Sequence, residues 1–186
     1  SNEQVQILIY LGRSYANDGD YDKAMSIYTN ALEIGEKNKL YNLVGYTYSY
    51  IGDLYREKAM RTEAIKKYEM AADNFKKENN IDSYTCALRD MGREYASIDS
   101  LSHAIEILST ADSLTANSKD IDVKAAIDNA LGNIYVMQNK YDEAKKFFYK
   151  ALEGREKMPN YMALIDLYIA SDSISQAKGL LQKIPQ

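Results

Sequence analysis

Apolar residues along the chain recur at the spacing of one helix face. Two such runs lie near the start, spaced i, i+3, i+4, i+7 and then i, i+4, i+7: Leu8, Leu11, Gly12 and Tyr15, followed by Ala24, Tyr28 and Ala31. Residues with this spacing lie on one side of an α-helix. The polar segment 17–20, which reads Asn-Asp-Gly-Asp, separates the two runs. The pattern therefore predicts a helix hairpin.

The hairpin pattern recurs every 40 residues. Glycine occupies the same place in the first helix of four copies: Gly12, Gly52, Gly92 and Gly132. Alanines occupy two matching places in the second helix: Ala24 and Ala31, Ala64 and Ala71, Ala104 and Ala111, Ala144 and Ala151. A weaker fifth copy follows after a step of 33: Tyr161, Leu164, Tyr168, Ala177 and Leu181. A fixed period of this size indicates a stacked repeat architecture.

The recurring glycines predict how each hairpin packs. Glycine within an exposed helix costs roughly 1 kcal/mol relative to alanine. Four glycines at the same position of the repeat, which we call the same phase, therefore need a structural reason. We expect the partner helix to cross closely at these positions, with the alanines completing the close approach. A tyrosine one turn after each glycine is expected to fill the space where the hairpin widens: Tyr15, Tyr55, Tyr95 and Tyr135.

The sequence predicts ten helices, which belong to five repeats. The predicted helices are 3–17, 21–37, 40–57, 61–78, 81–97, 101–117, 121–138, 141–157, 159–170 and 174–184. The predicted repeats are 1–38, 39–78, 79–118, 119–157 and 158–186. The last repeat has Ile165 at the glycine place and opens at Met158-Pro159, where proline suits a first helical turn. It fits a terminal repeat and, equally, a repeat that further helices follow.

These residues resemble the tetratricopeptide repeat (TPR), whose pattern is a large apolar residue, Leu-Gly, Tyr, then Ala, an aromatic residue and Ala. The match covers about Val5 to Glu156 and is weaker over 158–184. The resemblance implies an all-α superhelical solenoid of antiparallel helix hairpins, one domain over residues 1–186. Two features depart from the family pattern. The period is 40 rather than the usual 34, as in long-helix members of the superfamily, and the proline that commonly closes a repeat is missing.

Composition restricts the possible partners. The 186 residues are 46% hydrophobic and 27% charged, with a net charge of −4. The acidic balance argues against nucleic acid as the main partner. One cysteine, Cys86, excludes an internal disulfide. No run approaches the roughly 18 apolar residues of a membrane span, so we expect no membrane insertion by this segment. An extracytoplasmic position in a membrane-anchored protein is favoured over a cytoplasmic one, although the sequence does not fix the compartment or the oligomeric state.

Catalytic chemistry has little support in the sequence. The one histidine, His103, lies at the start of a predicted second helix and is expected to be exposed. None of the common catalytic, metal-binding or phosphate-binding motifs occurs, so we predict no enzyme activity, no metal site and no cofactor. One residue fits its repeat poorly. Asp128 stands where Leu8 and Leu88 stand in other copies, and we expect it to be half exposed.

The resemblance places a binding surface on the inner, concave face, which the first helices line. Its phases give four residues per repeat: Gln6, Ile9, Tyr10 and Arg13; Tyr46, Ser49, Tyr50 and Asp53; Cys86, Arg89, Asp90 and Arg93; Ala126, Asn129, Ala130 and Asn133. We take the following as candidate ligand-binding residues: Tyr10, Arg13, Tyr46, Ser49, Tyr50, Asp53, Arg89, Arg93, Asn129 and Asn133. Arginine can bind carboxylates with two hydrogen bonds, asparagine can hold a peptide backbone, and tyrosine offers rigid contact area.

Two structural alternatives apply to this surface. Arg89 and Arg93 could simply pair with Asp53 and Asp90 on neighbouring helices, as is common on solvated helix faces. The rings of Tyr46 and Tyr50 could serve packing between repeats.

The sequence therefore predicts a non-enzymatic module that binds a protein or peptide segment, with acidic groups on the ligand as one possibility. Its style is similar to TPR regions of bacterial membrane-anchored regulators, which implies a sensor or interaction region of a larger bacterial signalling or regulatory protein. The main alternative is a structural spacer or self-association solenoid without a ligand groove. A third is a domain that accompanies an enzyme.

Overall fold

The computed structural model describes residues 1–116 and 120–184, and within these ranges it holds ten α-helices and no strand. The chain divides into two compact units, Ser1–Ser100 and Leu101–Gln186. Unit 1 contains five helices: α1 (Asn2–Asn17), α2 (Tyr21–Lys37), α3 (Tyr41–Glu57), α4 (Arg61–Lys77) and α5 (Ile81–Ser97). Unit 2 contains the other five: α6 (Leu101–Thr115), α7 (Ile121–Met137), α8 (Tyr141–Ala151), α9 (Met158–Ala170) and α10 (Ile174–Leu181). The all-α hairpin architecture predicted from the sequence is confirmed.

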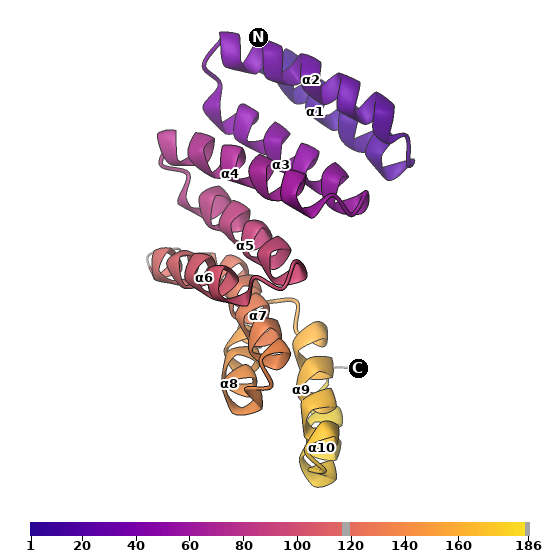
Figure 1. Cartoon of the computed structure of the whole chain (residues 1–186), viewed down its shortest axis with the longest axis vertical. Coiled ribbons are helices and arrows are strands. Elements are labelled where there is room, and N and C mark those ends of the chain that lie inside the picture. The colour runs from indigo at the N-terminus through magenta and orange to yellow at the C-terminus, as the bar shows by residue number, and fades with distance from the viewer. Residues whose placement is uncertain (117–119, 185–186) are drawn as a thin grey trace. The chain divides into compact units, whose positions relative to one another are not determined.

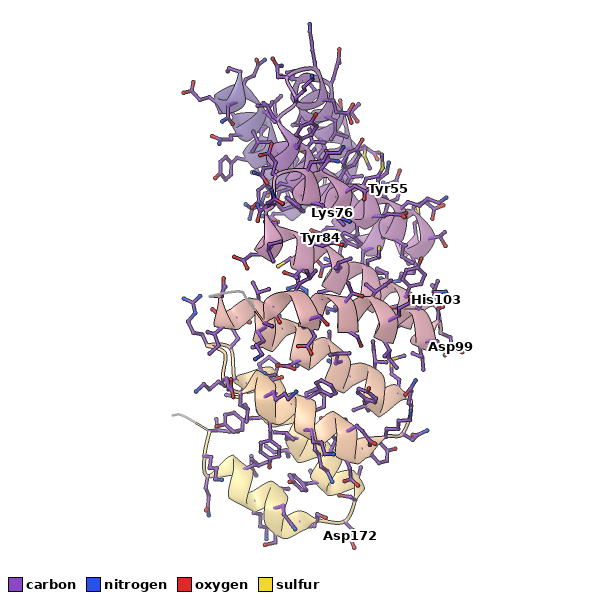
Figure 2. All side chains as sticks on the ribbon, turned by 90° about the vertical axis from the view of Figure 1, so that its left-hand side faces the viewer. Tyr55, Lys76, Tyr84, Asp99, His103 and Asp172 are labelled. Atoms are coloured by element: carbon purple, nitrogen blue, oxygen red, sulfur yellow. The ribbon has the colours of Figure 1, made fainter. Side chains whose placement is uncertain are left out.

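Within each unit, successive helices pack on one another. In unit 1 α2 packs on α3 and α4 packs on α5, so that the α1–α2 and α3–α4 hairpins lie side by side, as Figure 1 shows. The turns close with one residue at positive φ, such as Lys39 and Asn79. The next amide then bonds back across the helix end, as Leu40 N does to the Gly35 carbonyl at 2.9 Å. Figure 2 shows two further residues of this kind, Asp99 and Asp172, in their turns.

The predicted close approach is confirmed at Gly12, Gly52 and Gly132, where an aromatic ring occupies the space. A Cβ built on Gly52 would lie 2.6 Å from Cε1 of Tyr68, and one on Gly132 would lie 2.7 Å from Cε1 of Phe148. Gly12 meets the ring of Tyr28 in the same way. The paired alanines of the second helices are fully buried beside these rings. Glycine is therefore required because the ring of the partner helix lies directly over the main chain.

Two helices of unit 2 are shorter than the sequence predicts. Helix α8 ends at Ala151 instead of residue 157, and α10 ends at Leu181 instead of residue 184. After α8 the chain leaves the helix so that Gly154 can pack on α7, where an added Cβ would lie 2.5 Å from Cβ of Ala125. The predicted end of the sixth helix, residue 117, lies outside the described residues.

Burial also corrects two expectations in unit 2. Asp128 is only 1% exposed, so the expectation of a half-exposed carboxylate is wrong. In α10 the buried residues are Ala177 and Leu180. Leu181, at the phase of the buried aromatic residues in other repeats, is 54% exposed. Ile165 fills the glycine place of this repeat, so no side chain at the aromatic phase can lie against the main chain there.

Candidate functional site

The first candidate surface lies in unit 1, where α1 and α3 present neighbouring inner faces. These helices contact one another and border a hollow of about 300 Å³. The residues around it share the phases expected for the concave face, with Leu43 in addition: Gln6, Ile9, Tyr10, Arg13, Leu43, Tyr46 and Tyr50. Tyr10 is one of the most exposed large side chains of the chain, whereas Ile9 forms part of the floor. The hollow thus combines an apolar base with one cation at its edge.

The cation is Arg13, which lies on an aromatic stack. Its guanidinium carbon is 5.1 Å from the ring centroid of Tyr50, and the Tyr50 ring is stacked on Tyr28 at 6.0 Å and 16°. Burial raises the pKa of Tyr50, and the face of its ring attracts the guanidinium. Among the described residues, Arg13 makes no ion pair. Its N–H groups therefore remain available to an external acceptor.

Tyr46 is fixed in position on the opposite side of the hollow. Its ring packs edge-on against Phe75 at 4.9 Å and 67°. Its hydroxyl lies 2.8 Å from Oγ of Ser83 on α5. Gly45 leaves room for the Phe75 ring on α3, because a Cβ on Gly45 would lie 2.7 Å from Cε1 of Phe75. A tyrosine held in this way presents contact area without losing much rotamer freedom on binding.

A second hollow, of about 400 Å³, lies beside the first and shares Arg13 and Tyr50 with it. Its polar wall is a bonded network: Tyr68 donates to Oδ1 of Asp53 at 2.8 Å, and Arg56 pairs with the same oxygen at 2.9 Å. Burial raises the pKa of Asp53, although the bond from Tyr68 and the charge of Arg56 oppose that rise. Oδ1 of Asp53 is therefore already bonded within the wall.

Of the two predicted arginines of α5, Arg89 is paired and Arg93 is not. Arg89 donates two hydrogen bonds to Oδ1 of Asp90 on its own helix, at 2.9 and 2.8 Å. Arg93 is exposed and makes no ion pair with any residue that the structure describes. The cross-helix pairing of both arginines with Asp53 and Asp90 that the sequence allowed is thus not what the structure contains. Ser49 lies half-buried on α3 between the two tyrosines.

Asn129 and Asn133 belong to unit 2 and form a separate cluster. Asn129 donates from Nδ2 to Oδ1 of the buried Asn160 at 2.6 Å, and Asn133 donates to Oδ1 of Asn129 at 3.1 Å. Asn160 in turn donates to the carbonyl of Ala151 at 3.3 Å. A hollow of about 450 Å³ borders this cluster. The amides here bond mainly to one another and to the main chain.

The same hollow is closed on one side by the connection between α8 and α9. The main-chain N–H of Arg155 donates to Oδ1 of Asp122 at 2.8 Å, and its side chain pairs with the same carboxylate. Nothing in the repeat pattern marks these residues, since Asp122 lies on α7 and Arg155, 33 residues later, lies in the connection between α8 and α9. Asn160 was also missed, because it is a polar residue just after a proline in a degraded repeat.

No group of three or more His, Cys, Asp or Glu side chains able to hold a metal ion occurs among the described residues. His103 is exposed on α6 (Figure 2). Within the described ranges, none of the helices combines the length and apolar character needed to cross a membrane.

Comparison with known proteins identifies the repeat. Two family models, each described as Tetratricopeptide repeat, match residues 3–77 and 128–158. The chain belongs to the tetratricopeptide-repeat superfamily. TPR repeats are in general protein-interaction modules on a scaffold that is typically non-enzymatic.

Similar proteins add the fold and one sequence relative. BtubC (BKLC) from P. vanneervenii has a TM-score of 0.82 at 18% identity, covering 97% of this chain and 77% of that one. MamA has a TM-score of 0.66 at 19% identity, covering 92% and 91%. The photosystem I assembly protein Ycf3 of Acaryochloris marina is 35% identical over 77 residues, which are 40% of this chain and 46% of that protein. The match thus spans about half the length of this curated relative.

Proposed function

We propose that the chain is a non-enzymatic binding module that holds an extended protein or peptide segment against the inner face of unit 1. The observation that carries the proposal is the hollow between α1 and α3, where the unpaired guanidinium of Arg13 lies beside an apolar floor. Arg13 is exposed, so its guanidinium can exchange water for an acceptor on a ligand without breaking an internal ion pair.

The ligand chemistry follows from these groups. Arg13 can donate two N–H bonds to a carboxylate, while the floor around Ile9 and Leu43 can hold an apolar side chain. Tyr10 and Tyr46 supply flat contact area at the two sides, the kind of anchor on which protein interfaces depend. We therefore propose a segment with an apolar side chain next to a carboxylate, either an acidic residue or a chain terminus.

The finer role that we propose is the sensor or interaction region of a larger bacterial regulatory protein. The printed name of the relative Ycf3 describes an assembly protein, which is consistent with a module that holds other proteins. We place the candidate residues Arg89, Asn129 and Asn133 second to Arg13, because they are already bonded within the chain. Arg93 is also second, because it does not line the hollow between α1 and α3.

The test is selection followed by titration. Random peptides with free carboxyl termini are selected on the immobilised chain, and the affinity of an enriched, labelled peptide is measured by fluorescence anisotropy. Arg13→Gln should weaken binding by about 10- to 100-fold, the loss of a charge-assisted hydrogen bond worth about 1.5–3 kcal/mol. Tyr10→Ala should weaken it as well.

The matched control is Lys66→Gln, which removes one exposed positive charge from α4, away from the hollow. It should leave the affinity unchanged, and circular dichroism should show the same helicity for all variants. Equal affinities for the Arg13 variant, the Lys66 variant and the original chain would reject this site. Failure to enrich any peptide would favour the alternative of a spacer without a ligand groove.

A further inference from the structure

The two hollows of unit 1 follow one another along the same pair of helices. Arg13 of α1 and Tyr50 of α3 line both hollows. On α1 the residues before Arg13 line the first hollow and those after it line the second: Gln6, Ile9 and Tyr10, then Ala16 and Asn17. On α3 the same order holds around Tyr50: Leu43 and Tyr46, then Asp53, Leu54, Arg56 and Glu57. The two hollows therefore form one groove along α1 and α3, with Arg13 between them.

The length of this groove sets how much of a ligand it can hold. From Gln6 to Asn17, helix α1 rises about 17 Å, at about 1.5 Å per residue. An extended peptide advances about 3.3 Å per residue, so about five ligand residues can lie along the groove. Arg13 lies about 10 Å from the Gln6 end and about 6 Å from the Asn17 end. A carboxylate bound by Arg13 therefore has room for ligand residues on both sides.

The second hollow offers a hydrogen-bond acceptor close to Arg13. Oδ1 of Asp53 is bonded to Tyr68 and Arg56, whereas no residue that the structure describes bonds to Oδ2. These two partners hold the half-buried carboxylate in place on the wall of the hollow. An extended ligand carries a main-chain N–H at each residue, which can donate to such an acceptor. A ligand that ends at Arg13 has no residue in the second hollow to supply this donor.

We propose that the ligand of this groove is an internal segment of a protein chain that places an acidic side chain at Arg13. Its apolar side chain lies in the first hollow, and the residue on the other side of the acid enters the second hollow and donates its N–H to Asp53. The proposal rests on the peptide site proposed for unit 1 and decides between the two carboxylates which that site allows. A chain terminus at Arg13 would leave the second hollow, of about 400 Å³, without any ligand group.

The test compares four forms of one peptide enriched on the immobilised chain, each measured by fluorescence anisotropy. The first is the enriched peptide itself, and the second has an amidated carboxyl terminus. The third is cut directly beside the acidic residue, on the side away from the apolar anchor, and is capped at both ends. The fourth is full-length and is N-methylated at the first amide on that side. Amidation should leave the affinity unchanged, whereas the cut and the N-methyl group should each weaken binding about 3- to 10-fold.

Variants of the chain assign this loss to the second hollow. Asp53→Asn keeps an oxygen for Tyr68 and puts an N–H donor in place of Oδ2, so the cut and the N-methyl group should then cost nothing further. The matched control, Tyr10→Ala, changes an exposed residue of the first hollow only. It should weaken the full and the cut peptide by the same factor. Circular dichroism checks that both variants fold, and the four peptide forms decide the question on the original chain alone.

The outcomes separate this inference from the proposed peptide site. If amidation abolishes binding, or if the cut peptide binds as tightly as the full one, while Arg13→Gln still weakens binding, the ligand is not an internal segment and the peptide site stands. If Arg13→Gln leaves every form of the peptide unaffected, the peptide site itself is rejected and the internal segment with it. Sensitivity to the cut that persists unchanged in Asp53→Asn would overturn the role given to Asp53.

Discussion

Replacing Asp128 by leucine should stabilise the protein, because the native carboxylate is buried without full hydrogen bonding. The side chain is 1% exposed, and its Oδ1 has no hydrogen-bond partner. Leucine already occupies the same phase in two other repeats, at Leu8 and Leu88. The substitution therefore restores the repeat pattern and removes an uncompensated charge.

The electrostatics of the site give the magnitude. Burial raises the pKa of Asp128 from 3.8 to about 6, and Asp112 and Glu153 add to the rise while Lys150 and Lys124 oppose it. The folded state thus binds the proton more tightly than the unfolded chain. Below about pH 4 the carboxyl is protonated in both states and costs no stability. The free energy of unfolding falls as the pH rises from about 4 to about 6 and levels off above the folded pKa. The raised pKa of Asp128 therefore lowers the free energy of unfolding by about 3 kcal/mol at pH 7.5 and by about 1 kcal/mol at pH 4.5.

Urea unfolding followed by circular dichroism at the two pH values measures this difference. Asp128→Leu should gain about 3 kcal/mol at pH 7.5 and clearly less at pH 4.5. Asp128→Asn keeps the size of the side chain and should lose the same pH dependence. Repeat proteins unfold in parts, so hydrogen exchange of the α7 amides should locate the gain in unit 2.

The matched control is Asp166→Leu, which changes an exposed acid on α9 and should alter stability little at either pH. If Asp128→Asn keeps the pH dependence of the original chain, or if Asp128→Leu gains nothing at pH 7.5, the reasoning about the buried charge is refuted.

The glycine contacts and the asparagine cluster give further predictions, each measured by thermal or urea unfolding. Gly52→Ala should destabilise the protein by about 1–3 kcal/mol, because the added methyl meets the Tyr68 ring. Gly179→Ala, where an added Cβ has nothing within 4 Å, should stabilise it by about 0.5–1 kcal/mol. Equal effects of the two substitutions would contradict the packing explanation. Asn160→Ala should destabilise the protein by about 2–3 kcal/mol, because it leaves buried polar groups unpaired. Arg155→Ala removes an exposed ion pair and should destabilise it less. A larger effect of Arg155→Ala would contradict the importance of the buried hydrogen bonds of Asn160.

The helix boundaries followed closely from the sequence because the repeat supplies several copies of the same signal. All ten helices begin within one residue of the predicted positions. The end of α8 could not be predicted, because residues 152–157 carry no local stop signal strong enough to end a helix. What ends it is a contact between helices: Gly154 packs on α7, and Asp122 binds the main chain of Arg155.

Only part of the candidate site could be predicted from the sequence. The phases of the inner face correctly grouped Tyr10, Arg13, Tyr46 and Tyr50 around one hollow, although their role in binding stays a prediction. Phase gives the direction of a side chain and says nothing of its partners. The sequence therefore ranked Arg89 with Arg13, and only the structure distinguishes the paired guanidinium from the one that lies unpaired on an aromatic ring.

In a repeat protein, the comparison between copies turns exposure itself into information. An exposed isoleucine on an ordinary helix needs no explanation, because much of any protein surface is apolar. Ile7 is instead compared with its phase, and the residues at that phase in three other repeats are buried under a preceding helix. Asp128 is the opposite case, a polar residue at a phase where its neighbours enforce burial. Both follow from one rule: the stack sets how far each phase is buried, so the exposure of a residue is informative only against its phase.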